Sequence, residues 1–363
     1  MKKLTAPLAA CLLLSLPVAA HRPEEPPHQT HCMGDLVLES GESIRDFCIS
    51  YVTHGTLNAD KSNAILMVTA IGGNHHRIDY LIGPGRALDP ARYFIIATDA
   101  IGNGLTSSPS NSKAQARMKF PRFNMRDMVA SQHRLVTEKF GIKRLVSVIG
   151  ASMGGMQALQ WGVSHPDMTA SLVPLIPLGR TPPWTTGILE MLRQSIMSDP
   201  NWNDGNYTTP PEKGMRLWSG WLSGMVVRTP HAHNAQFGAK NADIVPWLKG
   251  VQDGGWRRLE AIDWVYQSWA YDQHDVSATR GFNGDYAAAL RSIKAKTLIM
   301  GGVGDLLNPE ADAIFCAREI PGARYVAIAP DDPFGHASAA GTRAKDNALQ
   351  NAEIQRFLEA LPR

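Results

Sequence analysis

The chain has 363 residues, 44% of them hydrophobic, and a formal net charge of only +3. Positive and negative side chains are interspersed, which excludes a basic nucleic-acid-binding stripe and a basic amphipathic membrane-surface segment. The length fits one large α/β domain with an insertion, or two domains.

Residues 1–20 have the features of a secretory signal peptide. Met1-Lys2-Lys3 is basic, the run from Leu4 to Leu16 is apolar, and Val18-Ala19-Ala20 provides small residues for cleavage. The apolar run is too short to cross a bilayer, and no other segment resembles a membrane span. We therefore expect cleavage after Ala20 and a periplasmic or secreted protein. A lipoprotein cleavage box ending at Cys11 is the less favoured interpretation, because little apolar sequence precedes it.

Residues 21–33 are predicted to be a flexible leader, from the Pro-rich and charged composition that begins at His21. Two strands follow, near 35–39 and 43–53, joined by a turn at residues 40–42. In a symmetric register across this turn, Cys32 and Cys48 face each other. Because exported proteins can keep disulfides, we expect one here, worth ~2–4 kcal/mol, with two packed thiols as the alternative. Cys316, in an apolar helical pattern, is then the remaining thiol.

Strands and helices alternate up to residue 176, which predicts a parallel sheet with right-handed crossovers. The predicted elements are strands at 64–70, 93–98, 144–149 and 172–176, with a helix at 125–140. Residues 177–282 lack strand patterns and contain predicted helices at 185–197, 211–227 and 256–271. The α/β pattern then resumes with strands at 297–300 and 324–329 and helices at 309–319 and 342–361. We expect a core of residues 34–176 and 283–363, with residues 177–282 forming a helical cap over the site.

The segment from Leu145 to Trp161 predicts a catalytic serine. A buried-type strand runs into Gly150-Ala151-Ser152-Met153-Gly154, and an apolar-periodic helix follows at once. This is the context of a nucleophile elbow, in which the serine occupies a strained turn and glycines avoid collisions with the packed strand and helix. The alternative is an ordinary strand-to-helix turn with Ser152 as the helix N-cap.

A serine nucleophile needs a base, and the base needs an orienting carboxylate. In this type of fold, the carboxylate follows the serine along the chain and the histidine comes last. Asp305 follows a buried strand, and His336 is the only histidine after it. The alternatives are an aspartate in an ordinary turn and a solvated loop histidine.

An oxyanion hole needs two N–H donors. We expect them from Met153, after the serine, and from Ala70 or Ile71, after the strand at 64–70. His75 and His76 are interpreted as loop residues near the mouth of the site. No Cys/His spacing is typical of zinc, so we predict no metal and no cofactor.

Three segments resemble the homoserine O-acetyltransferase family of α/β-hydrolases. They are the elbow from Gly150 to Trp161, the segment 120–129, and the cap segment 198–207. The resemblance implies an α/β-hydrolase fold with a cap, an acyl-serine intermediate and a homodimer through the cap. Ser152, Asp305 and His336 fall on the family's triad positions. Arg193 falls near its substrate-carboxylate arginine, and Tyr207 is a second substrate-binding candidate.

Two features differ from the family's pattern. Its homoserine-acetylating enzymes carry an aspartate directly after the catalytic histidine, where it holds the acceptor's ammonium, but this chain has Ala337. A buried ammonium without a carboxylate is costly. The second feature is the predicted export, away from acetyl-CoA. We therefore expect an exported serine hydrolase acting on a small-molecule acyl ester. The alternatives are an acyl-CoA-dependent O-acyltransferase of this family and a non-catalytic binding protein.

Overall fold

A computed structural model describes residues 27–238 and 240–362 of the chain. The predicted signal peptide, the lipoprotein box and the first part of the leader lie outside the described residues. Eight strands form one sheet in the order β1-β4-β6-β5-β7-β8-β9-β10, and β2 and β3 form a separate small sheet. Pairing in the large sheet is antiparallel for β1–β4 and β4–β6 and parallel elsewhere.

The strand bounds agree with the predicted alternation, with most ends shifted by one to three residues. The ten strands are β1 Gln29–Cys32, β2 Leu36–Val37, β3 Ser43–Ile44, β4 Cys48–His54, β5 Ala64–Val68, β6 Phe94–Thr98, β7 Leu145–Ala151, β8 Thr169–Leu175, β9 Lys296–Gly302 and β10 Arg324–Ile328. The predicted strand at 43–53 is divided into β3 and β4 at the Arg45–Phe47 loop.

The prediction that residues 21–33 form a flexible leader is wrong at its end. Residues Gln29–Cys32 form β1, which pairs antiparallel with β4 and places Cys32 opposite Cys48. These two cysteines form a disulfide, as the symmetric register predicted. Composition did not indicate β1, because its order comes from hydrogen bonds with the otherwise open edge of β4.

The core lies on both faces of the sheet, and β5 shows why. Ala64, Leu66 and Val68 belong to one apolar cluster, whereas Ile65 and Met67 belong to a second cluster on the opposite face. This alternation is the period-two geometry of a strand buried on both sides.

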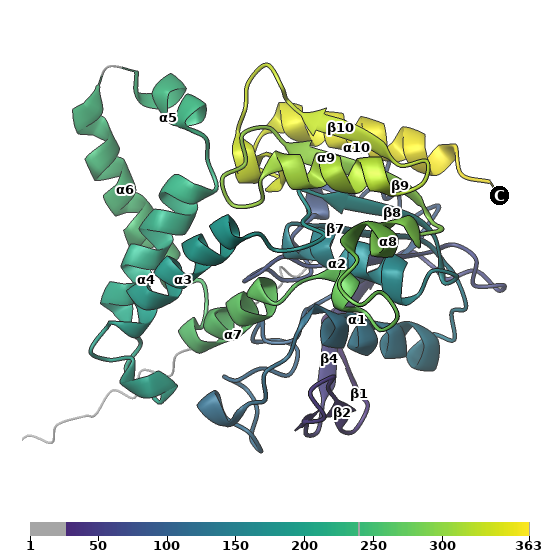
Figure 1. Ribbon diagram of the computed structural model, residues 1–363, viewed down its shortest axis with the longest axis horizontal. Helices are drawn as coiled ribbons and strands as arrows, with labels where there is room; N and C mark the ends of the chain where they lie inside the picture. The colour runs from purple at the N-terminus through teal and green to yellow at the C-terminus, as the bar shows by residue number, and fades with distance from the viewer. Residues whose placement is uncertain (1–26, 239, 363) are drawn as a thin grey trace, which may run out of the picture.

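Helices cover both faces of the sheet (Figure 1). The first cluster includes residues of α1, α2, α8 and α9, and the second includes residues of α10. Outside the cap region, these helices are α1 Met125–Arg134, α2 Met153–Ser164, α8 Tyr286–Arg291, α9 Glu310–Glu319 and α10 Ala344–Glu359. A π-helical segment, Leu135–Lys139, continues α1.

Between β8 and α8, the described chain contains five α-helices, and Figure 1 shows α4, α5 and α6 on one side of the sheet. They are α3 Pro183–Met197, α4 Glu212–Ser219, α5 Pro230–Phe237, α6 Asn241–Gly255 and α7 Ala261–Asp272, and the π-helical segment η5, Gly220–Val226, extends α4. Sequence patterns missed α5 and α6. Pro246 and three glycines disfavour a helix at α6, but packing against α4 and η5 overrides this local preference. Among the described residues, no helix is long and apolar enough to cross a membrane.

Candidate active site

Ser152 lies at the sharp turn between β7 and α2, as the elbow motif predicts. Its backbone has φ 60° and ψ −123°, a strained conformation for a residue with a side chain. The neighbouring glycines are required by close packing. A Cβ atom at Gly150 would lie 2.5 Å from the carbonyl carbon of Gly154, and one at Gly154 would lie 2.4 Å from the Val68 oxygen. Close packing of β5, β7 and α2 therefore fixes the serine.

His336 connects Ser152 to Asp305. Its Nε2 lies 2.8 Å from the Ser152 Oγ, and its Nδ1 lies 2.8 Å from Asp305 Oδ2. All three residues are buried, with at most 6% of their surface exposed. With the proton on Nδ1 donated to Asp305, Nε2 is free to accept the serine proton.

The loop after β9 orients Asp305. Its Oδ1 accepts the backbone N–H groups of Leu307 at 2.8 Å and Asn308 at 2.9 Å, which leaves Oδ2 for His336. The Asn308 amide also donates to the Ile176 oxygen, so the carboxylate is fixed by the loop and by the end of β8.

The loop after β5 offers backbone donors beside the elbow. The N–H of Gly72 donates to Gln267 Oε1 at 2.8 Å, and that of Gly73 donates to the Ala70 oxygen at 3.0 Å. Within the described chain, the N–H groups of Ala70 and Ile71 make no hydrogen bond. They and the N–H of Met153, at the first position of α2, remain available to an oxyanion.

Tyr271 is a site residue that the sequence analysis missed. It is fully buried on α7, and its hydroxyl donates to Asn308 Oδ1 at 2.6 Å. Burial raises the pKa of Tyr271, and interactions with Ser152 and Asn308 oppose that rise. The cap region thus supplies a neutral hydroxyl next to the serine. An apolar helix pattern gives no signal for such a role.

The two predicted substrate-binding residues are engaged elsewhere. Arg193, buried on α3, forms ion pairs with Asp272 at 2.6 Å and Glu190 at 2.8 Å and donates to Ser268. The Tyr207 hydroxyl hydrogen-bonds Glu260 and accepts the N–H of Ile262. No contact in the described residues joins either of them to Ser152, Asp305 or His336.

His75 and His76 lie in the loop after β5, as expected. His75 bonds through Nδ1 to Asp99 Oδ2 at 2.8 Å, and its backbone N–H donates to the other oxygen of Asp99. Polar atoms of His28, His75 and Asp99 lie within 4.8 Å of one another and could hold a metal ion, although the prediction was no metal. Sequence spacing could not indicate this group, because its members come from three separate segments.

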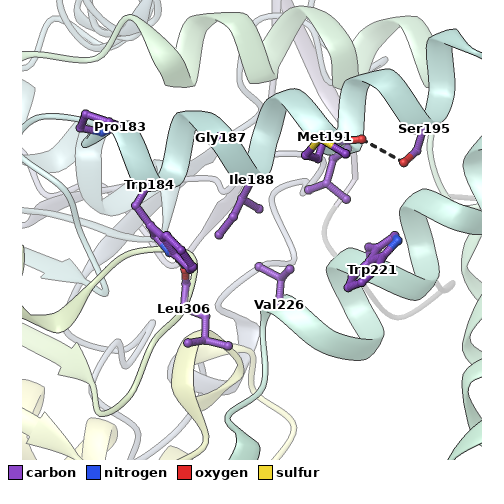
Figure 2. A pocket seen from close by; sticks show the side chains of 10 residues that line it. Pro183, Trp184, Gly187, Ile188, Met191, Ser195, Trp221, Val226 and Leu306 are labelled. Atoms are coloured by element: carbon purple, nitrogen blue, oxygen red, sulfur yellow. Dashed lines mark hydrogen bonds between the residues drawn. The ribbon is translucent and has the colours of Figure 1, made fainter.

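Two hollows are lined by residues of the cap helices. One, of about 570 Å³, lies between the loop of Ile71, Gly72 and Gly73 and cap residues that include Trp218, Leu222 and Val251. The other, of about 630 Å³, is apolar and lies between α3 and η5, next to Leu306. Figure 2 shows Trp184, Ile188 and Met191 of α3 on one side of this pocket, with Trp221 and Val226 on the other.

Comparisons with known proteins agree with this fold. A profile of the alpha/beta hydrolase fold family matches residues 63–340. A probable esterase of Corynebacterium glutamicum is 35% identical, over 85% of this chain and 89% of its own length. The homoserine O-acetyltransferase of Moorella thermoacetica is 34% identical, over 83% of this chain and 88% of its own length.

A solved structure shows the same architecture. The acetylester hydrolase from Corynebacterium glutamicum has a TM-score of 0.83 at 30% identity, over 92% of this chain and 96% of that one. The relatives thus include both esterases and acetyltransferases. The chain therefore belongs to the α/β-hydrolase family, among enzymes related to the homoserine O-acetyltransferases.

Proposed function

We propose that this protein is an exported serine hydrolase that cleaves a small acyl ester through an acyl-Ser152 intermediate. One observation carries the proposal: His336 lies within hydrogen-bond distance of both Ser152 and Asp305, at 2.8 Å in each case. This is the geometry that general-base activation of a serine requires.

The reaction follows from these contacts. His336 Nε2 takes the Ser152 proton as Oγ attacks the ester carbonyl, and the oxyanion accepts hydrogen bonds from Met153 and from Ala70 or Ile71. When the intermediate collapses, the bond to the alcohol oxygen breaks and His336 returns the proton to the leaving alcohol. A water molecule then gives a proton to His336 and attacks the acyl group; the bond from the acyl carbon to Ser152 Oγ breaks, His336 returns the proton to Oγ, and the acid is released.

Water is the acceptor favoured by the residues around His336. Ala337 follows the histidine and has no charge to hold an amino-acid ammonium. The loop of Ile71, Gly72 and Gly73 is called the oxyanion loop below. The 570 Å³ cleft beside it is lined by described residues that include no aspartate or glutamate. An amino-acid acceptor such as homoserine would therefore leave its ammonium without a carboxylate partner.

Acyl transfer is the second candidate function, because the related Moorella thermoacetica protein is a homoserine O-acetyltransferase. It would use the same acyl-Ser152 and differ only in the attacking hydroxyl. Mass spectrometry of the products from an acetyl ester or acetyl-CoA, with millimolar homoserine present, separates the two functions. We expect free acid from the ester to dominate. Predominant O-acetylhomoserine would overturn the hydrolase proposal.

The same assay tests the role of position 337. Ala337→Asp supplies the missing carboxylate, so we expect a higher ratio of O-acetylhomoserine to free acid, with a small increase because the surrounding pocket is unchanged. Ala337→Asn, which adds similar volume without the charge, is the control. An equal increase in both variants would contradict the electrostatic argument.

Covalent labelling tests the nucleophile itself. A fluorophosphonate probe should label the unmodified protein at Ser152 and leave Ser152→Ala unlabelled. Absence of labelling in the unmodified protein would favour the third alternative, a non-catalytic binding protein.

Export is part of the proposal and has its own test. The N-terminal sequence supports it, and the Cys32–Cys48 disulfide is compatible with an oxidising compartment. We expect the protein purified from the periplasm or medium to begin at His21. A protein that stays in the cytoplasm and begins at Met1 would contradict this.

A further inference from the structure

The cleft beside the oxyanion loop carries positive charge that no residue of its lining neutralises. Arg77 and Arg258 both line it, and none of the described lining residues is an aspartate or glutamate. Arg77 follows the oxyanion loop, and Arg258 lies on the opposite, cap side, between α6 and α7. The cleft therefore presents guanidinium groups from both of its walls.

Arg77 is held without an acidic partner. Its Nη1 donates to the Ala339 oxygen at 2.8 Å, and within residues 27–238 and 240–362 it forms no ion pair. Partial burial lowers the pKa of Arg77, because loss of solvent disfavours the charged form. A guanidinium stays charged in proteins, so this desolvation cost persists until an anion pairs with it.

Arg193 provides the contrast within the same protein. Its side chain is buried, but Asp272 and Glu190 both lie within 2.8 Å of its guanidinium. A ligand carboxylate would have to compete with two resident carboxylates there. Arg77 has only a carbonyl partner and so has donors left for a ligand.

Arg77 contacts the segment that contains His336, the hydrogen-bond partner of the reacting serine. The carbonyl that it binds, Ala339, belongs to the same short helical segment as His336, Gly335–Ala339. Ile71 and Gly72, from the loop with the free oxyanion donors, line the same cleft. A group held by Arg77 would therefore lie between the oxyanion loop and the histidine segment.

We propose that this cleft binds an anionic group of the substrate, so that the enzyme prefers esters carrying a carboxylate to neutral esters of the same size. The inference rests on the proposed hydrolase function and names its substrate class. Arg77 binds the carboxylate through its planar fork of N–H donors, and Arg258 approaches it from the cap. Charge-assisted hydrogen bonds of this kind change affinity by about ten- to one-hundredfold.

Two pairs of model esters test the preference and locate the charge. For the acyl side, 4-nitrophenyl hemiglutarate is compared with 4-nitrophenyl 5-methylhexanoate, which has a neutral branched end. For the alcohol side, 3-(4-acetoxyphenyl)propionate is compared with its methyl ester. In at least one pair, kcat/KM should be about tenfold or more higher for the anion. Ratios near one in both pairs, with the neutral esters hydrolysed, would overturn the inference and leave the hydrolase function standing.

Substitutions of Arg77 and Arg258 then test which of the two residues produces the preference for anionic esters. Arg77→Met should lower the ratio of anionic to neutral ester kcat/KM by about tenfold or more, beyond any loss that both esters share, and Arg77→Lys should restore part of the ratio. Arg258→Met should lower the ratio less. Arg257→Met is the matched control, because the Arg257 guanidinium lies 4.6 Å from the Trp256 ring and does not line the cleft. Equal losses for both esters in Arg77→Met would show a structural role only and would contradict the inference.

A binding measurement keeps the test independent of catalysis. Calorimetry on Ser152→Ala should detect monomethyl glutarate but not dimethyl glutarate, and the Ser152→Ala/Arg77→Met double variant should lose the signal. If Ser152→Ala binds neither monomethyl glutarate nor 3-(4-acetoxyphenyl)propionate, the anion site is refuted. If it binds while the unmodified protein hydrolyses no ester, the anion site stands and the proposed hydrolase function fails.

Discussion

The two carboxylate oxygens of Asp305 have different hydrogen-bond partners. Oδ1 accepts two backbone N–H groups, and Oδ2 accepts the His336 Nδ1 proton. An asparagine at this position would keep its oxygen on the N–H groups and turn its amide toward His336. The amide would donate to Nδ1 and so force the proton onto Nε2, the atom that must accept the serine proton.

We therefore predict that Asp305→Asn remains folded but loses up to roughly four orders of magnitude in kcat. Ser152→Ala and His336→Ala should each cost about as much as the two together, because a triad acts as one unit. Steady-state kinetics on a model ester, with circular dichroism as the control for folding, provides the measurement. Turnover of Asp305→Asn near that of the unmodified enzyme would place the orienting carboxylate elsewhere.

Between elements, a buried carboxyl joins the helix α7 to the loop after β6. Asp263 Oδ1 accepts the N–H of Ser110 at 2.9 Å, and Oδ2 lies 2.5 Å from the Ser110 hydroxyl. Burial raises the pKa of Asp263 to about 7, despite the opposing hydrogen bonds from Ser110. Below that pH, the neutral acid can donate to the Ser110 oxygen and accept from its N–H.

The raised pKa of Asp263 makes the folded protein less stable as the pH rises. Between the ordinary value of 3.8 and about 7, the folded protein binds more protons at Asp263 than the unfolded chain does. The contribution of Asp263 to the free energy of unfolding is therefore fully present below pH 4, falls as pH rises toward 7, and is lost above pH 7. Asp263→Asn mimics the neutral acid, and urea unfolding should show a smaller fall in its free energy of unfolding between pH 4.5 and 7.5. The difference should be on the order of 1–4 kcal/mol, whereas parallel pH profiles would contradict the assignment.

The disulfide joins β1 to the sheet at its antiparallel edge. It links residues 16 apart in the sequence. Cross-linking restricts the unfolded chain, so a Cys32→Ser/Cys48→Ser variant should lose about 3 kcal/mol in free energy of unfolding. Urea unfolding with and without reductant is the measurement, and reductant should have no effect on the double variant.

Thiol counting under denaturing, non-reducing conditions gives a second readout of the same bond. A chain that begins at His21 should have one free thiol, Cys316. Three free thiols in that chain would show that Cys32 and Cys48 are not oxidised.

At the scale of the whole molecule, the cap region carries an exposed apolar surface. Trp184, Met191 and Trp221 are each more than half exposed and line the same 630 Å³ pocket (Figure 2). Large exposed apolar side chains grouped in this way are typical of protein–protein contacts. We propose that a second copy of the chain covers them in a homodimer through the cap.

Placing charges on this surface tests the dimer. Met191→Glu/Trp221→Glu should convert the dimer to a monomer in sedimentation velocity experiments, because two carboxylates would be buried without partners. Ile314→Glu on α9 is the matched control, since this residue is 47% exposed but lies outside the cap. A monomeric unmodified protein at micromolar concentration would refute the proposal.

The sequence alone determined the parts of this protein that are governed by local rules. The period-two and helical patterns predicted the positions of strands β4 to β10 along the chain, because buried strands are nearly continuous apolar runs. The elbow predicted Ser152 because close packing tolerates only glycine at 150 and 154. The chain order of this fold then selected Asp305 and His336, and the register across a turn predicted the pairing of Cys32 with Cys48.

Only the tertiary structure decided which groups neutralise one another. Arg193 and Arg77 look equally available in the sequence, but folding brings Asp272 of α7 to the first and only a carbonyl to the second. The contacts of Tyr271 and of the His28–His75–Asp99 group could likewise not be predicted from the sequence, because their partners come from distant segments. Local periodicity records which face of an element is buried. Charge compensation depends on contacts between elements, and these form only when the chain folds.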